Sequence, residues 1–360
     1  MAARRYRWQV RRVSRRRGQS LTAIYNMAEN QAVVGLVAAG LEHVSDTKIQ
    51  QVTALTFAGV TIQMEQRNKA MNYFISMMVE KMRKAGIYTV LVKGQGVGQC
   101  YERPLWRSCG DVNLFFDAEN YERAKTYLIP LATSVESEEK RKKYQAMVID
   151  TWLVELHGLM PTEISECINA GVERVQNNIF ADGGVRIWKN DEMDVLLPSP
   201  DNDVIIVFAH FLQHFFVGGV GLRQICDWCR LLWTYRSELD VAKLEGRLRL
   251  AGLMTAWRAF GAFAVEYLGM DAAAMPFYSD AAKWKRKASR IRDFVLMSGN
   301  FGHNRDHSYF EKYPYLMRKC VSFGRRVGDL ARHARIFPID SLRFSPAMLV
   351  NGVRSAVRGE

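Results

Sequence analysis

The sequence lacks the features that mark a secreted, membrane-spanning or disulfide-framed protein. Its six cysteines are scattered through 360 residues, whereas a disulfide framework needs a dense set in a short chain. The apolar run at 32–41 has only ten residues and follows Glu29, so it is well short of the roughly 20 that a transmembrane helix needs. No stretch has the pattern of a secretory signal. We therefore expect a cytoplasmic chain without a transmembrane segment.

Acidic residues are absent from the start of the chain. None precedes Glu29, whereas eight arginines lie between residues 4 and 17, and a second basic stretch runs over 318–358. The net charge of +13 is concentrated in these two regions. We expect residues 1–19 to form a disordered basic arm, which can contact nucleic acid nonspecifically. An RNA-binding protein built on the two basic ends is therefore one hypothesis for the function.

Hydrophobic periodicity divides the rest of the chain into three parts. Apolar residues recur at helical spacing over 20–86, which predicts an N-terminal helical segment. Residues 87–160 carry short β-branched and alternating runs, which predict an α/β core. The pattern over 161–360 predicts a region that is mostly helical. The predicted fold class is α+β: a small mixed β-sheet with flanking helices, and a larger helical region.

The core and the helical region can be divided further into individual elements. Asp117 is placed to cap a helix, because its side chain can accept a hydrogen bond from a free backbone N–H of the first turn. The predicted strands cover 88–92, 111–116, 144–149 and 152–157, and the predicted helices cover 118–128, 204–217, 222–235, 241–267 and 281–297.

A glycine-rich turn follows the first predicted strand. Lys93, Gly94, Gln95 and Gly96 end this strand and open a helix. Glycines let the backbone approach a ligand closely, and the start of a helix offers free N–H groups to an anion such as phosphate. The spacing is neither that of the nucleotide-binding P-loop nor that of the dinucleotide fingerprint. Alone, the turn is weak evidence for phosphate binding, and a solvated lysine at the end of a strand is the alternative interpretation of Lys93.

Oxygen-bearing side chains lie on the strands that follow. Asp111 and Asn113 point to the same side of their strand, since alternate residues of a strand share a face. Beside a phosphate loop, they predict a site for Mg²⁺ or Mn²⁺. Glu155 can add a third oxygen from the strand at 152–157, and His157 would share its face. The simpler interpretations are that Asp111 caps a turn and that Glu155 is an exposed strand residue.

Taken together, these motifs resemble a known family. The segment from Leu91 to Phe116 contains Leu-Val-Lys-Gly, then Tyr101 and Pro104, and then Arg-Ser-Cys-Gly-Asp-Val-Asn-Leu. It resembles nucleotidyltransferases of the polymerase-beta superfamily whose motifs read L-K-G, L-Y-x-x-P and R-x-x-G-D-x-D-L. The strand Val154–His157 is similar to the family's carboxylate-bearing strand. The family's helical motif, H-x-x-x-H followed by L-R-x-x-x-D, is matched by His210, His214, Leu222, Arg223 and Asp227. The resemblance covers residues 22–235.

The resemblance implies a transferase that moves a nucleoside monophosphate from an NTP to an unidentified hydroxyl acceptor, with Mg²⁺ or Mn²⁺ as cofactor. Asp111, Asn113 and Glu155 would form the catalytic metal site, with Glu155 also acting as the base or orienting it. The phosphate-binding residues that it implies are Lys93, Gly94, Gln95, Gly96, Arg107 and Gly110.

The sequence departs from the family's pattern at Asn113, where the motif has a second acid. An amide oxygen can ligate Mg²⁺ but brings no charge, so metal binding should weaken. A nucleotide-binding but weak or inactive relative, such as an antitoxin-like regulatory protein, is therefore an alternative.

The helical motif also leaves alternatives open. His210 and His214 are either core histidines or histidines that contact the metal ligands without binding the metal themselves. Arg223 and Asp227, four residues apart, form a helical ion pair or orient the helical region against the nucleotide.

Overall fold

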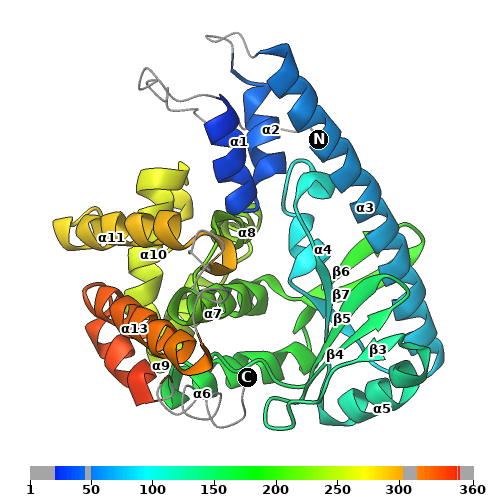
Figure 1. Cartoon of the computed structure of the whole chain (residues 1–360). Helices are drawn as coiled ribbons and strands as arrows, with labels where there is room; N and C mark the ends of the chain where they lie inside the picture. The colour runs from blue at the N-terminus through cyan, green and yellow to red at the C-terminus, as the bar shows by residue number, and fades with distance from the viewer. Residues whose placement is uncertain (1–20, 45–49, 303–313, 347, 349–360) are drawn as a thin grey trace.

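The computed structural model describes residues 21–44, 50–302, 314–346 and 348. The predicted basic arm, residues 1–19, lies outside these residues, as does part of the second basic stretch. In Figure 1 the β-sheet occupies one half of the molecule and a group of helices the other. No helix in the described part of the chain is long and apolar enough to cross a bilayer.

Five strands form the main sheet: β1 (Val90–Val92), β2 (Asp111–Phe115), β3 (Ser134–Val135), β4 (Tyr144–Ile149) and β5 (Trp152–His157). Their order across the sheet is β1-β2-β5-β4-β3. The β2–β5 pair is parallel, whereas the other pairs are antiparallel. The small mixed sheet predicted from the sequence is thus confirmed, and β4 and β5 span the predicted residues.

The two faces of the sheet bury different kinds of side chain. Val112, Leu114, Val154 and Leu156 pack against the helices α3 (Gln51–Lys84) and α5 (Ala118–Leu128). The carboxylate of Asp117 accepts a hydrogen bond from the Asn120 N–H at 2.8 Å, which confirms the predicted cap. Because side chains alternate along a strand, the polar residues of β2 and β5 point to the opposite face.

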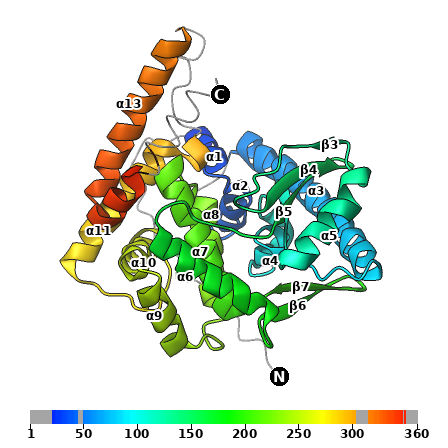
Figure 2. The same ribbon diagram turned by 90° about the horizontal axis from the view of Figure 1, so that it is seen from below.

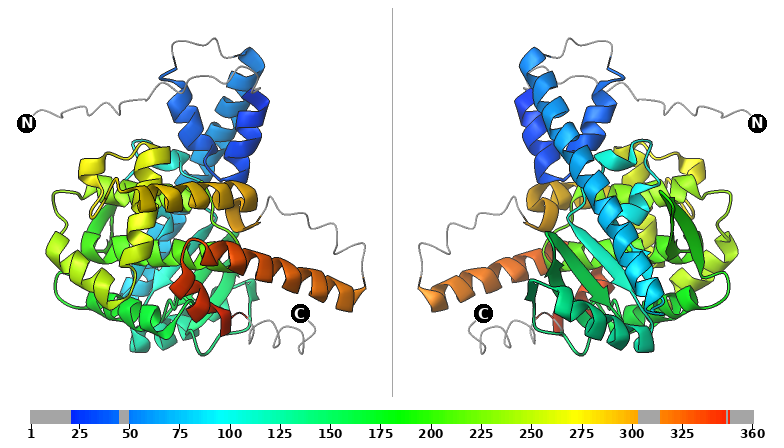
Figure 3. Two further views of the ribbon diagram at one scale, coloured as in Figure 1. Left: turned by 90° about the vertical axis from the view of Figure 1, so that its left-hand side faces the viewer. Right: turned by 90° about the vertical axis from the view of Figure 1, so that its right-hand side faces the viewer.

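The helices before the sheet also hold its loops in place. After α1 (Leu21–Asn30) and α2 (Val34–Leu41), the long α3 runs along the outside of the sheet (Figures 1 and 3). Asn68 of α3 is buried and donates hydrogen bonds to the carbonyls of Leu105 and Arg107, each at 2.8 Å. These bonds fix the segment η1 (Pro104–Trp106) beside the short helix α4 (Gly94–Gly98).

The helical half is built around aromatic side chains. Phe208 of α7 (Pro200–Val217) contacts Trp228 of α8 (Leu222–Thr234) and Trp257 of α10 (Met254–Leu268), and all three are fully buried. The predicted helix at 241–267 is divided into α9 and α10, with Gly252 between them at φ +70°. In Figures 2 and 3, α13 extends away from the body.

The helices of this half are α6 (Glu166–Asn177), α7 (Pro200–Val217), α8 (Leu222–Thr234), α9 (Val241–Leu250), α10 (Met254–Leu268), α11 (Ala282–Ser298) and α13 (Tyr315–Ala334). Short 3₁₀ turns are η2 (Ile129–Leu131), η3 (Asn178–Phe180), η4 (Ala272–Ala274) and η5 (Asn300–Gly302).

A β-hairpin interrupts the region that was predicted to be mostly helical. Its strands are β6 (Val185–Asn190) and β7 (Met193–Pro198), paired antiparallel. The buried side chains of Val195 and Leu197 alternate along β7 and pack into the core between the sheet and α3. The region is mostly helical, as predicted, but this hairpin was not predicted, because the core selects a strand here through contacts that are distant in sequence.

A buried ion pair joins the two halves. The guanidinium of Arg107, 5% exposed, donates to both carboxylate oxygens of Asp227 on α8, at 2.8 and 2.6 Å. The hydroxyl of Tyr101 donates to the same carboxylate at 2.8 Å. Paired and hydrogen-bonded in this way, the two charges tolerate burial; removal of either would leave the other uncompensated.

We predict that Arg107→Ala lowers the free energy of unfolding by about 3–5 kcal/mol, because it leaves the Asp227 carboxylate buried without its cation. The matched control is Arg103→Ala. Arg103 pairs with Glu42 at the surface, with both side chains more than 40% exposed, and such a pair contributes about 1 kcal/mol or less. Urea unfolding followed by circular dichroism measures both. Equal losses in the two variants would contradict a special role for the buried pair.

Candidate active site

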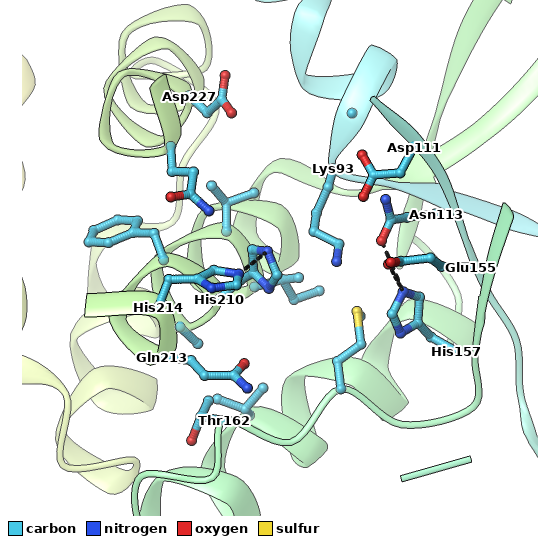
Figure 4. Close-up of a pocket in the computed structure, with 18 of the residues that line it drawn as sticks. Lys93, Asp111, Asn113, Glu155, His157, Thr162, His210, Gln213, His214 and Asp227 are labelled. Atoms are coloured by element: carbon cyan, nitrogen blue, oxygen red, sulfur yellow. Dashed lines mark hydrogen bonds and ion pairs between the residues drawn. The ribbon is translucent and has the colours of Figure 1, made fainter. Parts of the chain in front are cut away.

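A pocket of about 370 Å³ lies between the sheet and the helices α7 and α8. Lys93, Asp111, Asn113, Glu155 and His157 line it on the side of the sheet. The side chains of His210, Gln213 and His214 reach it from α7 (Figure 4). Residues more than 100 positions apart in the sequence thus face one cavity.

The register of the two parallel strands gathers the predicted metal ligands. Asn113 of β2 is paired with Glu155 of β5, and Asp111 lies one alternation earlier on β2. The three side chains point to the same side of the sheet, toward Lys93 (Figure 4). The structure thus brings together the three residues that were predicted to share a metal ion. Their role as ligands stays a prediction.

His157 connects two of these side chains. Its Nε2 lies 2.9 Å from Oδ1 of Asn113 and 3.4 Å from Oε2 of Glu155. Both partners are acceptors, so Nε2 is the protonated nitrogen of the ring. The hydroxyl of Tyr144 donates to the other oxygen of Glu155 at 3.0 Å. Two donors therefore fix the orientation of the Glu155 carboxylate.

The pocket keeps Glu155 ionised and His157 neutral. Burial alone would raise the pKa of Glu155, but the hydrogen bond from His157 and the charge of Lys93 lower it to about 2. Burial lowers the pKa of His157, and the charge of Lys93 lowers it further, against the opposing effect of Glu155. A carboxylate with so low a pKa suits a metal ligand better than a base.

Lys93 adopts a strained backbone conformation at the N-terminus of α4. Its φ is +58° and its ψ −146°, a region that costs a residue with a side chain about 1–3 kcal/mol. Burial lowers the pKa of its ammonium, whereas the charges of Glu155 and Asp111 raise it. Strain of this kind persists only where surrounding structure imposes it, and it is concentrated at functional sites.

Only some of the residues that were predicted to bind phosphate line the pocket. Gly94 and Arg107 line the pocket together with Lys93. Gln95 instead donates to Asn68 at 2.8 Å, and a Cβ on Gly96 would lie 2.7 Å from the Leu197 side chain, so both residues face the core. Gly110 is exposed and does not contribute to the pocket wall.

Arg107 has a protein partner in this structure, and its role in phosphate binding stays a prediction. It lines the pocket, but its guanidinium is committed to Asp227. The predicted helical pair between Arg223 and Asp227 is correspondingly wrong: Arg223 donates to the carbonyl of Ser108 at 2.8 Å. Tertiary contacts have thus replaced the local pair that was predicted between Arg223 and Asp227.

The two histidines of α7 form the opposite wall. The Nε2 atoms of His210 and His214 are 3.1 Å apart, and the ring of His214 stacks edge-on against Phe301 at 4.9 Å. Burial, followed by the charge of Lys93, lowers the pKa of both, that of His214 to about 4. Both rings are therefore neutral at physiological pH, and they lie in the pocket wall itself rather than in the core.

Several residues of this pocket were not predicted from the sequence, including Tyr144, Thr162, Gln213 and Phe301. A signal existed for Tyr144, because in the short β4–β5 hairpin it is paired with His157. The other three are brought in by the helical half. No group of three or more His, Cys, Asp or Glu side chains placed to hold a metal occurs within the described ranges.

Asp111, Asn113 and Glu155 thus lie on adjacent strands of the mixed sheet, beside a glycine turn. The profile of a family described as "uncharacterised nucleotidyltransferase" matches residues 18–269, and the chain belongs to this family. No curated protein matches the chain significantly. Among solved structures, an antigenic nucleotidyltransferase-like protein from Paracoccidioides brasiliensis is similar, at 14% identity and a TM-score of 0.35, covering 59% of this chain and 94% of that one.

We predict that His157 titrates below its ordinary pKa of 6.5 in the metal-free protein, because burial and Lys93 disfavour its charged form. Asn113→Asp should raise this pKa, since it places a carboxylate 2.9 Å from Nε2 and stabilises the imidazolium. Nitrogen-15 NMR of the ring measures the shift. Asn178→Asp, at an exposed position, is the matched control and should change nothing. An unchanged His157 in Asn113→Asp would disprove the contact.

Proposed function

We propose that this protein is a metal-dependent nucleotidyltransferase that moves a nucleoside monophosphate from an NTP to a hydroxyl acceptor. The observation that carries the proposal is the convergence of Asp111, Asn113 and Glu155 on one pocket with Lys93. Membership of a nucleotidyltransferase family supports the same reaction class.

The donor set fits Mg²⁺ or Mn²⁺. Mg²⁺ prefers oxygen ligands and is commonly held by one or two carboxylates together with substrate phosphates, rather than by a complete cage of protein ligands. Asp111 and Glu155 would supply the carboxylates and Asn113 a neutral oxygen. The low pKa of Glu155 keeps its charge available. When bound, the ion would neutralise phosphate charge and make the acceptor hydroxyl more acidic.

The residues around the ligands have supporting tasks in this proposal. Tyr144 and His157 hold the Glu155 carboxylate in one orientation. Lys93 and Gly94 line the pocket, where the triphosphate would lie. The neutral polar side chains of His210, Gln213 and His214 line the remaining wall and would contact the acceptor or the nucleoside.

The proposed transfer is a single displacement at phosphorus. The acceptor oxygen forms a bond to the α-phosphorus of the NTP, and the bond from that phosphorus to the β-phosphate oxygen breaks. Pyrophosphate leaves with the electron pair, and the hydroxyl proton is released to water. The protein positions the groups and balances the charge, which is where most of the catalysis of phosphoryl transfer arises.

We predict that Asp111→Asn and Glu155→Gln each lower nucleotidyl transfer by at least about 100-fold, because each removes a charge worth several kcal/mol from the proposed metal site. Transfer is measured as pyrophosphate release from each NTP with Mg²⁺ or Mn²⁺, with sugars, protein and RNA offered as acceptors. Asp182→Asn, which removes an exposed carboxylate outside the pocket wall, is the matched control. Transfer that survives loss of both ligands would exclude the proposed site.

Asn113 favours a second candidate, a protein that binds nucleotide without turnover and acts as a regulatory, antitoxin-like partner. We predict for this case that the wild type binds an NTP but releases no pyrophosphate, and that Asn113→Asp gains turnover by restoring a charged ligand. The calorimetric affinity for NTP, set beside the pyrophosphate assay, separates the two candidates. The hypothesis of RNA binding through the basic arm concerns residues outside the described ranges.

A further inference from the structure

An exposed apolar stripe runs along α13, the helix that extends away from the body (Figures 2 and 3). Its residues recur at intervals of three or four positions, so they share one face of the helix. Single exposed apolar residues are common, whereas a continuous apolar stripe marks a surface that contacts something else. All members of the stripe are exposed: Met317, Cys320, Phe323, Gly324, Val327, Ala331 and Ala334.

A different face of α13 attaches the helix to the body, close to its C-terminal end. The ring of His333 contacts those of Phe215, Phe216 and Phe294, with ring centroids 4.8, 5.0 and 4.6 Å apart. Leu330 packs against the same core. The exposed stripe is therefore not the surface that holds α13 in the fold.

Positive charges flank the stripe on both sides. The helix contains five lysines and arginines against one acid, Asp329. Arg332 pairs with this acid at 3.1 Å, so an excess of positive charge remains on the helix. With 3.6 residues per turn, Lys319 and Arg326 lie beyond one edge of the stripe, and Arg318, Arg325 and Arg332 lie beyond the other.

We propose that α13 binds the surface of an anionic lipid bilayer, with its apolar stripe in the membrane interface and its cations at the headgroups. Interfacial helices combine an apolar face that carries residues such as Phe with a polar face rich in Lys and Arg, and bury the apolar face by about 5–10 Å. Basic side chains at the edges cover apolar surface with their stems while their charged ends reach the headgroups. This inference does not depend on the proposed nucleotidyl transfer.

The charge and the apolar stripe together distinguish a bilayer from other occupants. A second copy of the helix would bring basic edges together, and like charges in an interface are unfavourable. Nucleic acid would attract the cations, but contacts to phosphate would leave Met317, Phe323 and Val327 in water. An anionic bilayer offers negative headgroups and apolar acyl chains side by side, which matches both features of α13.

The helix α3 offers a matched control surface. It also exposes apolar side chains, among them Ile62 at 56% and Tyr73 at 70%, compared with 55% for Met317 and 51% for Phe323. Residues 51–73 of α3 carry two cations and one acid, so this surface lacks the positive excess of α13. The double variants Met317→Gln/Phe323→Gln and Ile62→Gln/Tyr73→Gln therefore remove similar apolar groups from surfaces of different charge.

Cys320 lies within the stripe and allows this face to be observed directly. It and Cys167 of α6 are the exposed cysteines, whereas the other four are buried or partly buried. Burial raises the pKa of the partly buried Cys226 to about 12, which slows its labelling. A nitroxide on Cys320 in the variant Cys167→Ser reports on the stripe, and a nitroxide on Cys167 in Cys320→Ser reports on a surface outside it.

The test mixes the full chain with vesicles of phosphatidylcholine and phosphatidylglycerol in equal parts, or of phosphatidylcholine alone. Electron paramagnetic resonance measures collisions of the nitroxide with oxygen, which concentrates in the bilayer, and with a nickel chelate, which stays in water. We expect the anionic vesicles to increase the oxygen collisions and decrease the nickel collisions at Cys320, and to change neither at Cys167.

The double variants test the contribution of the apolar stripe. Binding of Met317→Gln/Phe323→Gln to the anionic vesicles, measured by sedimentation, should fall by about tenfold or more, because interfacial binding scales with the apolar area buried. We expect Ile62→Gln/Tyr73→Gln to bind as the wild type does. Circular dichroism checks that each variant is folded.

Several results would overturn the proposal. Binding that leaves the Cys320 nitroxide in water would assign the attachment to another part of the chain, such as the arginines at 4–17. A wild type that binds no vesicles, that binds both kinds equally, or whose two double variants lose equally would also contradict it. Shielding of the label without vesicles, by added RNA or in a particle of twice the mass, would assign the stripe to nucleic acid or to a second copy instead.

Discussion

The parallel pairing of β2 with β5 is the constraint on which the site depends. It sets Asn113 beside Glu155 and puts Asp111 on the same face, so that three oxygen-bearing side chains from two segments meet. A shift of one residue in this register would turn the polar side chains of β2 or those of β5 toward α3. The apolar side chains of the opposite face prevent such a shift, because Val112, Leu114, Val154 and Leu156 are all buried there. The hydrophobic core thus determines the polar geometry.

The second constraint is the attachment of the helical half. Arg107 and Asp227, with Tyr101, bind α8 to the loop that precedes β2. This attachment closes the pocket, since one wall comes from the sheet and the other from α7 and α8. The histidines of α7 stay neutral in this enclosure, mainly through burial. Arg107, which was predicted to bind phosphate, therefore has a structural partner in this chain.

Charge and strain are concentrated at one corner of the pocket. Lys93 combines an unfavourable backbone conformation with a partly buried side chain. Its charge lowers the pKa of Glu155, His157, His210 and His214. These costs are offset by the surrounding core, in particular by the contacts of α4 with α3 and β7 through Gln95 and Gly96. Within the glycine turn, Gln95 and Gly96 contribute to packing, whereas Lys93 and Gly94 line the cavity.

The sequence by itself determined four of the five strands of the sheet, all except β3, together with the Asp117 cap and the set of oxygen-bearing residues. Alternation and capping act within a few residues, which is why they could be predicted. The sequence also contains the motifs by which the chain resembles nucleotidyltransferases. Only the tertiary structure decided that β6 and β7 form a hairpin, that Asp227 pairs with Arg107 instead of Arg223, and that Gln95 and Gly96 face the core. These outcomes depend on partners that are distant in sequence, whose burial outweighs the local preference of each segment.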